Sequence, residues 1–358
     1  MKLNIIFWCE KFYPTIGGTE ISLYRQIKQL FKDGANVSVI SHDENGKHLQ
    51  YNKNNNFKMV QLDNNKKDIF KALEIIRNIN KKSLVYISGI FRSNPLPSLM
   101  TIKEVSKDID TVLRIPTSGD LDELSDFSLA DFLGNLAGFI CLDNAIEKEI
   151  RKYVQHPIVF LHKNGIPIDD FSKNKFSKNG DFLFIGRLSK TKGVSVLIDA
   201  WKKYKTKGGS RKLIIYGPKK PGYVLRELKD NAFLYRHGIE YRGPMQDVWR
   251  HFKSSRAIII PSLKEGHSNV MLEAMAAGIP VIASNISGLR GDLLASEAGV
   301  LFNKENSDQL ACELLKFEDG VYDLVKMSKK GHRFIKNNRT LKHSIKNLHK
   351  MFQKIGSK

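Results

Sequence analysis

The stretch of residues 256–284 constrains the fold more than any other part of the chain. Residues 257–260 form a short apolar run without polar alternation, which is typical of a parallel strand buried on both faces. The polar loop that follows ends in Ser268 and Asn269, and either residue is a good N-cap for the helix predicted over 270–277. A glycine and a proline then end that helix before a second apolar run at 281–284. This order of elements predicts a doubly wound α/β fold, with the loop at the edge of the sheet where such folds bind ligands.

Glu265 and Glu273 stand eight positions apart and flank the predicted helix start. The unpaired amides of a first helical turn attract an anion such as a phosphate, whereas a carboxylate repels one. The favourable partner of such a carboxylate is a neutral polyol, whose hydroxyls donate hydrogen bonds to ionised oxygens. The loop therefore predicts a sugar bound beside a phosphate. The alternative is that Glu265 is a solvated loop residue and that Glu273 only complements the helix dipole.

Similar apolar runs recur along the chain and predict two open parallel sheets with helices on both faces. The first sheet is predicted from strands at 3–8, 37–41, 57–61, 84–88, 111–115 and 139–142. The second is predicted from strands at 181–186, 212–216, 239–241, 257–260, 281–284 and 300–302. Helices are predicted at 19–32, 194–204, 223–231, 246–254, 270–277, 307–317 and 340–355, and the polar segment 43–56 is predicted to be a surface excursion. We expect a first domain at 1–163, a hinge at 164–180 and a second domain at 181–339.

Two short motifs outside the central stretch carry further candidates. Gly17 and Gly18 precede the first helix and free the backbone to approach a ligand, although a tight turn alone would also explain them. Arg187 and Lys192 share a loop between a strand and a helix at the same sheet edge as Glu265. The two cations can converge on a diphosphate, with the alternative that both are ordinary surface residues.

These motifs together resemble one known family. EGHSNVMLE followed by AMAAGIPVIAS resembles the E-x7-E signature of retaining family-four glycosyltransferases, also called glycosyl transferases group 1. FYPTIGGTE, NGIPIDDF and FIGRLSKTKG match the family elsewhere, so the resemblance covers most of the chain. It implies the glycosyltransferase-B fold, in which two Rossmann-like domains face each other across a cleft. It also implies that the last helix, within about 340–358, crosses back to the first domain.

The resemblance also implies roles for individual residues. Arg187 and Lys192 would neutralise the departing diphosphate, Glu265 would hold the donor sugar, and His267 would lie near that sugar. Glu273 would hold the ribose. The remaining donor positions implied are Gly17, Gly18, Gly266, Ser268, Asn269 and Val270. Members of the family are thought to transfer the sugar by front-face attack, with the leaving phosphate taking the acceptor proton and with no metal or other cofactor.

The acceptor side departs from the family pattern. Family members often carry a histidine after the strand predicted at 111–115, and the run PTSGDLDEL contains none. The polar residues available there are Arg114, Thr117, Ser118 and Asp120. Asp120 and Asp122 also form a D-x-D pair, which in a different class of transferase binds a divalent metal through oxygen ligands. A metal-dependent reaction is therefore an alternative, and a chelator would abolish it.

Charge is distributed unevenly along the chain. The net charge of +21 divides into +3 for residues 1–163 (22 Lys and Arg, 19 Asp and Glu) and +18 for the rest (36 and 18). The predicted C-terminal helix carries an apolar stripe of Leu341, Ile345, Leu348, Phe352 and Ile355 beside Lys342, Lys346, Lys350 and Lys354. Such an excess favours an anionic membrane surface or a nucleic acid, with a solvated basic face as the alternative.

The cysteines and the hydropathy favour the cytoplasm. Cys9, Cys141 and Cys312 show no pairing pattern, and the first apolar run is too short for a signal peptide. The resemblance to the family implies a hexosyltransferase-type enzyme that uses a nucleotide-diphosphate sugar, with UDP rather than GDP, on a glycan or lipid-linked acceptor. The expected setting is envelope polysaccharide assembly, such as lipopolysaccharide, O-antigen or capsule, at the inner face of the cytoplasmic membrane. The alternatives are a soluble acceptor or, in a different class, a basic nucleic-acid-binding protein, against which stands the lack of a recognisable nucleic-acid module.

Overall fold

The computed structural model describes most of the chain in two units. The described residues are 4–13, 17–42, 57–79, 83–155, 157–168, 171, 177–220, 222–223, 225–244, 252 and 255–356. The excursion predicted at 43–56 lies outside them, as does all of the helix predicted at 246–254 except residue 252. The first unit comprises Met1–Gly165 and Leu341–Lys358, and the second comprises Ile166–Thr340. The segment that contains the C-terminal helix thus belongs to the first unit.

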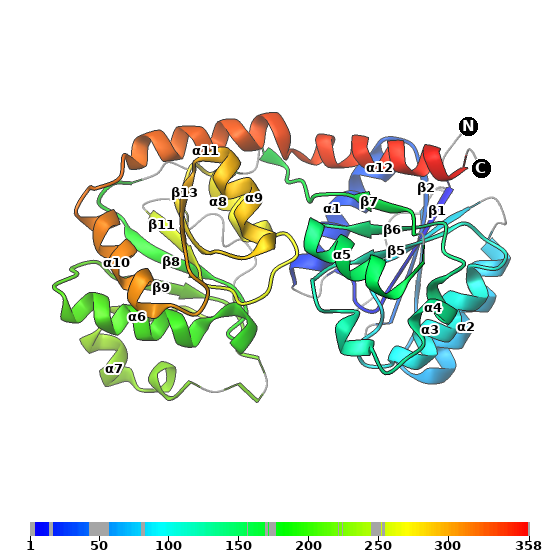
Figure 1. Cartoon of the computed structure of the whole chain (residues 1–358), viewed down its shortest axis with the longest axis horizontal. Helices are drawn as coiled ribbons and strands as arrows, with labels where there is room; N and C mark the ends of the chain where they lie inside the picture. Colours follow the sequence, from blue (N-terminus) through cyan, green and yellow to red (C-terminus); the bar gives the residue numbers. More distant parts are fainter. Residues whose placement is uncertain are drawn as a thin grey trace. The chain divides into compact units, whose positions relative to one another are not determined.

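The first unit is built on a seven-stranded parallel sheet in the order β3-β2-β1-β4-β5-β6-β7. The strands are β1 (Asn4–Cys9), β2 (Asn36–Ser41), β3 (Phe57–Gln61), β4 (Leu84–Ile87), β5 (Thr111–Ile115), β6 (Gly138–Cys141) and β7 (Val159–Leu161). The helices are α1 (Gly18–Lys32), α2 (Lys66–Ile79), α3 (Pro95–Val105), α4 (Leu129–Leu133), α5 (Asn144–Tyr153) and α12 (Leu341–Gly356). Side chains of α2 to α5 form the core on one face of the sheet, and those of α1 and α12 form the core on the other (Figure 1).

The second unit is built on a six-stranded parallel sheet in the order β10-β9-β8-β11-β12-β13. The strands are β8 (Asp181–Ile185), β9 (Leu213–Tyr216), β10 (Ile239–Tyr241), β11 (Ser255–Ile260), β12 (Val281–Ser284) and β13 (Gly299–Phe302). The helices are α6 (Val194–Thr206), α7 (Asn231–Arg236), α8 (Asn269–Ala276), α9 (Ser287–Ser296), α10 (Ser307–Glu318) and α11 (Leu324–Asn338). Helices α6 and α10 cover one face, and α8, α9 and α11 cover the other (Figure 1).

The predicted fold class is confirmed in both units, because all the paired strands are parallel and helices cover both faces of each sheet. In each sheet the order reverses at the first strand of the unit, which places β1 beside β4 and β8 beside β11. Such a reversal creates a switch point at the carboxyl edge of the sheet, where doubly wound folds bind ligands.

The prediction of one helix at 223–231 is wrong. The structure has a short 3-10 helix at Arg226–Lys229 and then α7. The boundary lies at Asp230, whose Oδ1 accepts hydrogen bonds from the backbone N–H groups of Ala232 at 2.9 Å and Phe233 at 3.1 Å. An aspartate that satisfies two first-turn amides starts a helix rather than continuing one.

Helix α12 buries the stripe predicted for it. Ile345, Leu348, Phe352 and Ile355 are each at most 4% exposed and belong to the core that α1 shares with the sheet. The four lysines at positions 342, 346, 350 and 354 are all exposed. Folding therefore uses only the apolar side of the helix. None of the helices in the described residues is both long enough and apolar enough to span a bilayer.

Candidate functional site

The loops that follow β8 and β11 touch each other at the switch point of the second sheet. The backbone N–H of Leu263 donates to the carbonyl of Thr191 at 2.8 Å. Gly193, at a φ of +65°, allows this approach, because a Cβ at that position would lie 1.8 Å from the carbonyl oxygen of Pro261. A side chain there would push the two loops apart. Two loops far apart in the sequence thus form one surface.

This contact brings Lys192 and Glu265 together. Nζ of Lys192 donates to Oε1 of Glu265 at 2.5 Å, and Oγ of Ser262 donates to the same oxygen at 2.8 Å. The Glu265 side chain is 12% exposed and the Lys192 side chain 33%, so both remain accessible to a small ligand. Within the described residues, Oε2 of Glu265 accepts no hydrogen bond. Ser262 was missed by the sequence reasoning, which had no reason to separate it from other loop serines.

The start of α8 forms the floor of the same loop. Ser268 is the N-cap, and its Oγ accepts a hydrogen bond from the N–H of Met271 at 3.3 Å, which confirms Ser268 among the two residues considered. The first-turn amides of α8 carry the positive end of the helix dipole. Asn269 is buried, whereas Val270 and Glu273 are half-buried on the helix that begins there. Gly266 is also buried, between Glu265 and His267.

His267 points into the protein and contacts a buried carboxylate. Its Nε2 lies 2.9 Å from Oδ2 of Asp292, and both side chains are 3% exposed. Arg339 donates to the same carboxylate from two guanidinium nitrogens. Its Nε donates to Oδ2 at 2.7 Å, and one terminal nitrogen donates to Oδ1 at 2.8 Å. Burial alone would raise the pKa of Asp292, but the hydrogen bonds from His267 and Arg339 outweigh it and hold that pKa well below its ordinary value. Asp292 is therefore an ionised carboxylate, and Nε2 of His267 is the donor.

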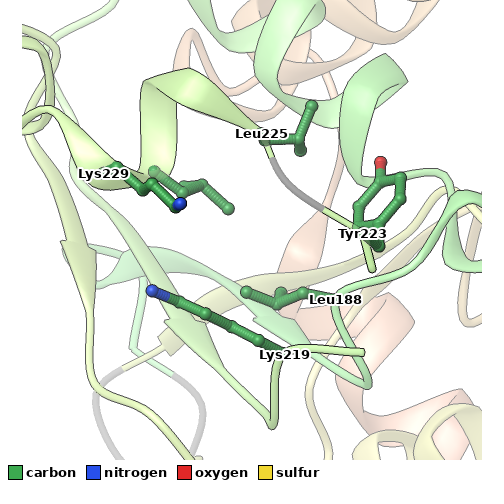
Figure 2. A pocket seen from close by; sticks show the side chains of 6 residues that line it. Leu188, Lys219, Tyr223, Leu225 and Lys229 are labelled. Atoms are coloured by element: carbon green, nitrogen blue, oxygen red, sulfur yellow. The ribbon is translucent and has the colours of Figure 1, made fainter. Parts of the chain in front are cut away.

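Arg187 is exposed and makes no hydrogen bond or ion pair with the described residues. It directly precedes Leu188, which lines a small hollow of about 40 Å³. Figure 2 shows Lys219 and Lys229 on one side of this hollow and Tyr223 on the other, with Leu188 below. The hollow places two lysines beside Leu188, the residue that follows Arg187, and neither had been singled out in the sequence.

In the first unit, Gly17 is the residue before α1 and Gly18 is the first residue of that helix, which follows β1 in the chain. Arg114 lies on β5 but is only 1% exposed, and one of its nitrogens donates to Oδ1 of Asn164 at 3.2 Å. Tyr86 lies in the same interior, where burial raises its pKa against the opposing charge of Arg114. Arg114 is thus placed beneath the surface, within the core between the sheet and α1.

The loop after β5 holds the other acceptor-side candidates. Thr117 and Ser118 are half-buried, and the N–H of Thr117 donates to Asp120 at 3.0 Å. Arg92 donates to the other oxygen of Asp120 at 2.6 Å, and burial raises the pKa of Asp120 against these contacts. Glu149 fixes the loop, because its carboxylate accepts from the N–H groups of Gly119 at 2.5 Å and Leu121 at 2.6 Å. These contacts of Glu149 were not predicted from the sequence.

The two carboxylates of the D-x-D pair bind different partners. Asp120 contacts Arg92 and Thr117, whereas Asp122 accepts hydrogen bonds from Lys152 at 2.9 Å and Tyr153 at 2.6 Å. No group of three metal-ligating side chains is found among the residues that the structure describes.

The second unit matches a known family over its whole length. Residues 166–341 match the family model of the glycosyl transferases group 1. The second unit thus belongs to the glycosyl transferases group 1. The capsular polysaccharide biosynthesis glycosyltransferase CapM of Staphylococcus aureus is 26% identical over 174 residues, which are 44% of this chain and 44% of CapM. The chain thus spans less than half the length of this relative.

Solved structures show the fold of the whole chain. Sucrose-phosphate synthase from Thermosynechococcus elongatus superposes with a TM-score of 0.82 over 99% of this chain and 100% of that one, at 14% identity. Anabaena HepE, solved in complex with UDP-glucose, gives a TM-score of 0.78 over 98% and 100%, at 15% identity. The chain therefore has the predicted glycosyltransferase-B fold, with two Rossmann-like units.

Proposed function

We propose that this group 1 glycosyl transferase moves a sugar from a nucleotide-diphosphate sugar to an acceptor hydroxyl, with retention at the anomeric carbon. The observation that carries the proposal is the Lys192–Glu265 pair at the switch point, beside the start of α8. It supplies a cation and helix amides for a diphosphate, and a carboxylate for sugar hydroxyls, on one surface. HepE, which shares the fold, was solved with UDP-glucose, and this supports a uridine rather than a guanosine donor.

The Lys192–Glu265 pair can bind a donor while the hydrogen bond between the two side chains stays intact. An ammonium group has three N–H donors, so Lys192 can keep one on Glu265 and direct the others at a phosphate. Ser262 and Lys192 occupy Oε1 of Glu265, which leaves Oε2 to accept from a sugar hydroxyl. Glu273, half-buried on α8, would accept from the ribose hydroxyls. His267 would shape the loop near the sugar.

The proposed reaction needs only groups of the substrates and of the site. The acceptor oxygen attacks the anomeric carbon from the face that the diphosphate leaves, the bond from that carbon to the phosphate oxygen breaks, and the acceptor proton passes to the departing phosphate. Negative charge grows on the diphosphate as it leaves. Lys192, Arg187 and the first amides of α8 stabilise this charge in the transition state, which is where such contacts accelerate a reaction. The scheme uses no metal or organic cofactor.

On the acceptor side we propose the first unit, with Thr117, Ser118 and Asp120 as the residues to test. Gly17 and Gly18 remain proposed donor positions, and Arg114 is set aside because it is only 1% exposed. The similarity to CapM supports a glycan acceptor in polysaccharide biosynthesis. A lipid-linked acceptor would place the enzyme on the inner face of the cytoplasmic membrane, and a soluble acceptor would not.

The exposed lysines of α12 support a peripheral contact with anionic lipid. Lys350 and Lys354 flank a groove of about 310 Å³ whose other wall is the edge strand β7, including Phe160 and Leu161. Leu161 is 50% exposed, which is unusual for a large apolar side chain beside a row of charges. Lysines that meet lipid head groups, with an exposed apolar residue across the groove from them, fit the surface of an anionic bilayer.

A panel of nucleotides in a thermal-unfolding assay tests the donor half directly. A ligand present at a hundred times its Kd stabilises the native state by about 2.7 kcal/mol. We expect UDP to raise the unfolding midpoint by several degrees, with GDP, ADP and CMP giving smaller shifts. If no nucleotide in the panel shifts the midpoint, the proposed donor site is wrong.

A further inference from the structure

Asp292 and Arg339 lie outside the motifs singled out in the sequence. They nevertheless contact, through His267, the loop of residues 261–268 between β11 and α8, which we call the donor loop. The loop residue His267 donates from Nε2 to Asp292 on α9, and Arg339 at the end of α11 donates twice to the same carboxylate. Three elements of the second unit therefore meet at one buried carboxylate. A buried charge held by two donors of this kind fixes the geometry of its partners, because breaking either contact removes part of what offsets its loss of hydration.

Helix α9 also packs closely against the backbone of the donor loop. Gly288 lies in the first turn of α9, and a Cβ at that position would come within 2.1 Å of the carbonyl oxygen of Glu265 and 2.8 Å of that of Gly266. The loop is therefore held at two points, at Glu265 by Gly288 and at His267 by Asp292. Both points belong to the same helix, so a change in the position of α9 moves the whole loop.

Arg339 connects this arrangement to the points where the chain enters and leaves the second unit. Its carbonyl accepts a hydrogen bond from the N–H of Ile166 at 3.0 Å, and Ile166 pairs with Thr340 in an isolated parallel bridge. Ile166 is the first residue of the second unit and Thr340 is the last. A continuous set of direct contacts thus runs from the Glu265 loop through His267, Asp292 and Arg339 to both crossing segments.

We propose that Asp292 and Arg339 are positioning residues of the donor site. They act through His267, which they hold in one orientation and protonation at Nε2. They thereby set the loop that carries Glu265 and leads into α8, whose first amides are the proposed contacts of the diphosphate. This inference rests on the proposed donor site. It predicts that loss of either contact weakens donor binding and turnover even where the fold is intact.

The test compares UDP binding by calorimetry with thermal unfolding for four variants of the full chain. Asp292→Asn keeps the size of the side chain and removes its charge, Arg339→Gln removes the bidentate donor, and Arg339→Lys keeps only the charge. Arg290→Gln is the matched control, because Arg290 lies on the same helix but is exposed, and among the described residues its side chain donates only to Asn285, at 2.6 Å. We expect Asp292→Asn and Arg339→Gln to weaken UDP binding at least tenfold, Arg339→Lys to recover part of that loss, and Arg290→Gln to bind like the unchanged protein.

The outcomes separate this inference from the proposed function. If the unchanged protein binds no nucleotide, the donor site itself is wrong. If it binds UDP, and the folded Asp292 and Arg339 variants bind UDP with the same affinity and turn over at the same rate, the two residues have only a structural role and the inference is wrong. Should Asp292→Asn fail to fold, the two Arg339 variants decide, because both leave Asp292 and His267 unchanged. Unchanged UDP affinity in Arg339→Lys together with unchanged affinity in Arg339→Gln would overturn the proposal.

Discussion

Lys192 donates from Nζ to Oε1 of Glu265 at 2.5 Å, across 73 positions of the sequence. Each residue stands at the carboxyl edge of one of the two strands that flank the switch point. The pair joins opposite charges that are proposed to bind opposite parts of one donor. Loss of Lys192 should therefore weaken nucleotide binding, whereas loss of Glu265 should not. Loss of either residue should lower the turnover rate.

Turnover should collapse when either partner is lost. We expect Lys192→Ala and Glu265→Gln each to lower kcat by about 100-fold or more, which is the size of effect that follows from removing a contact to developing charge. Lys190→Ala is the matched control, because Lys190 is an exposed lysine on the same short 3-10 turn. The measurement is release of UDP from a UDP-sugar in the presence of acceptor. Near-normal turnover in both variants would refute the assignment of the site.

A methyl group at Gly288 should disturb the donor loop. Gly288→Ala would place Cβ 2.1 Å from the carbonyl oxygen of Glu265, so the loop or α9 must shift. We expect a loss of about 1–3 kcal/mol in the free energy of unfolding, as for other overpacked sites, together with weaker UDP binding.

Gly291→Ala serves as the control for that variant. Gly291 is exposed on the same helix, where alanine is favoured over glycine by about 0.5–1 kcal/mol. Chemical denaturation of both variants checks the prediction. Equal stability of the two variants would mean that the close packing of α9 on the loop has no energetic consequence.

Stability should fall as the pH drops below about 6.5, because of His42. The indole N–H of Trp8 donates to Nε2 of His42 at 2.9 Å, and Nδ1 lies 3.0 Å from the carbonyl of Asp63. An indole only donates and a carbonyl only accepts, so the ring is neutral with its proton on Nδ1. Burial lowers the pKa of His42, against opposing contributions from the Asp63 carbonyl and from Asp68 and Glu10.

The sign of the effect follows from proton linkage. Below about pH 6.5 the unfolded chain binds a proton at His42 that the native protein does not, so the free energy of unfolding decreases by up to about 1.4 kcal/mol per pH unit until the folded pKa is reached. Urea unfolding at pH 7.5 and pH 5.5 should show this loss, and His42→Gln should show less of it. Parallel pH dependence in the two proteins would contradict the assignment.

Membrane binding should depend on α12. We expect the full chain to float with vesicles that contain anionic phospholipid at low salt, and to float less as salt screens the charges. Replacing Lys342, Lys346, Lys350 and Lys354 by Gln should abolish flotation, since each lysine near an anionic surface contributes about 1 kcal/mol.

A variant with Lys58, Lys66, Lys67 and Lys71 replaced by Gln is the control, because it removes the same charge from exposed positions on the first unit. It should still float. Loss of flotation in both variants would indicate that total charge decides binding, and absence of flotation in the unchanged protein would favour a soluble acceptor.

The strands were the most predictable part of the fold. Runs such as 257–260 are buried on both faces, so their residues are apolar without interruption and the sequence marks them clearly. The strand β7 was missed, because it has only three residues and lies at the sheet edge, where its side chains are half-buried or exposed. An edge strand carries little of the pattern that identifies a buried one.

Helices α9 and α11 were missed because each contains glycine. Gly288 and Gly331 count against a helix when only propensity is considered. In the structure both are packing positions: Gly288 admits the backbone of the Glu265 loop, and a Cβ at Gly331 would lie 3.0 Å from Cβ of Ala298 and 3.5 Å from Cα of Met275. The close approach that requires glycine is a tertiary contact, which the local sequence does not reveal.

The residues of the candidate site also differ in how far their placement could be predicted from the sequence. Lys192 and Glu265 could be placed together from sequence, since both follow buried strands that end at one edge of the sheet. Asp292 and Arg339 could not, because their contact with His267 depends on how α9 and α11 pack. The acceptor-side residues were found on the expected loop, although the burial of Arg114 beneath α1 follows from the interior position of β5 and was not foreseen.

The opposite roles of Lys192 and Glu265 are tested most directly by calorimetric titration of UDP into the unchanged protein, Lys192→Ala and Glu265→Gln. Loss of a charged hydrogen bond to a phosphate costs about 1.5–3 kcal/mol, so Lys192→Ala should weaken UDP binding by about 10-fold to 150-fold. Glu265→Gln removes a carboxylate that repels phosphate and competes for Lys192, so UDP should bind as tightly as before or several times more tightly. Equal affinity for all three proteins, or weaker binding by Glu265→Gln, would contradict the division of the donor between the two residues.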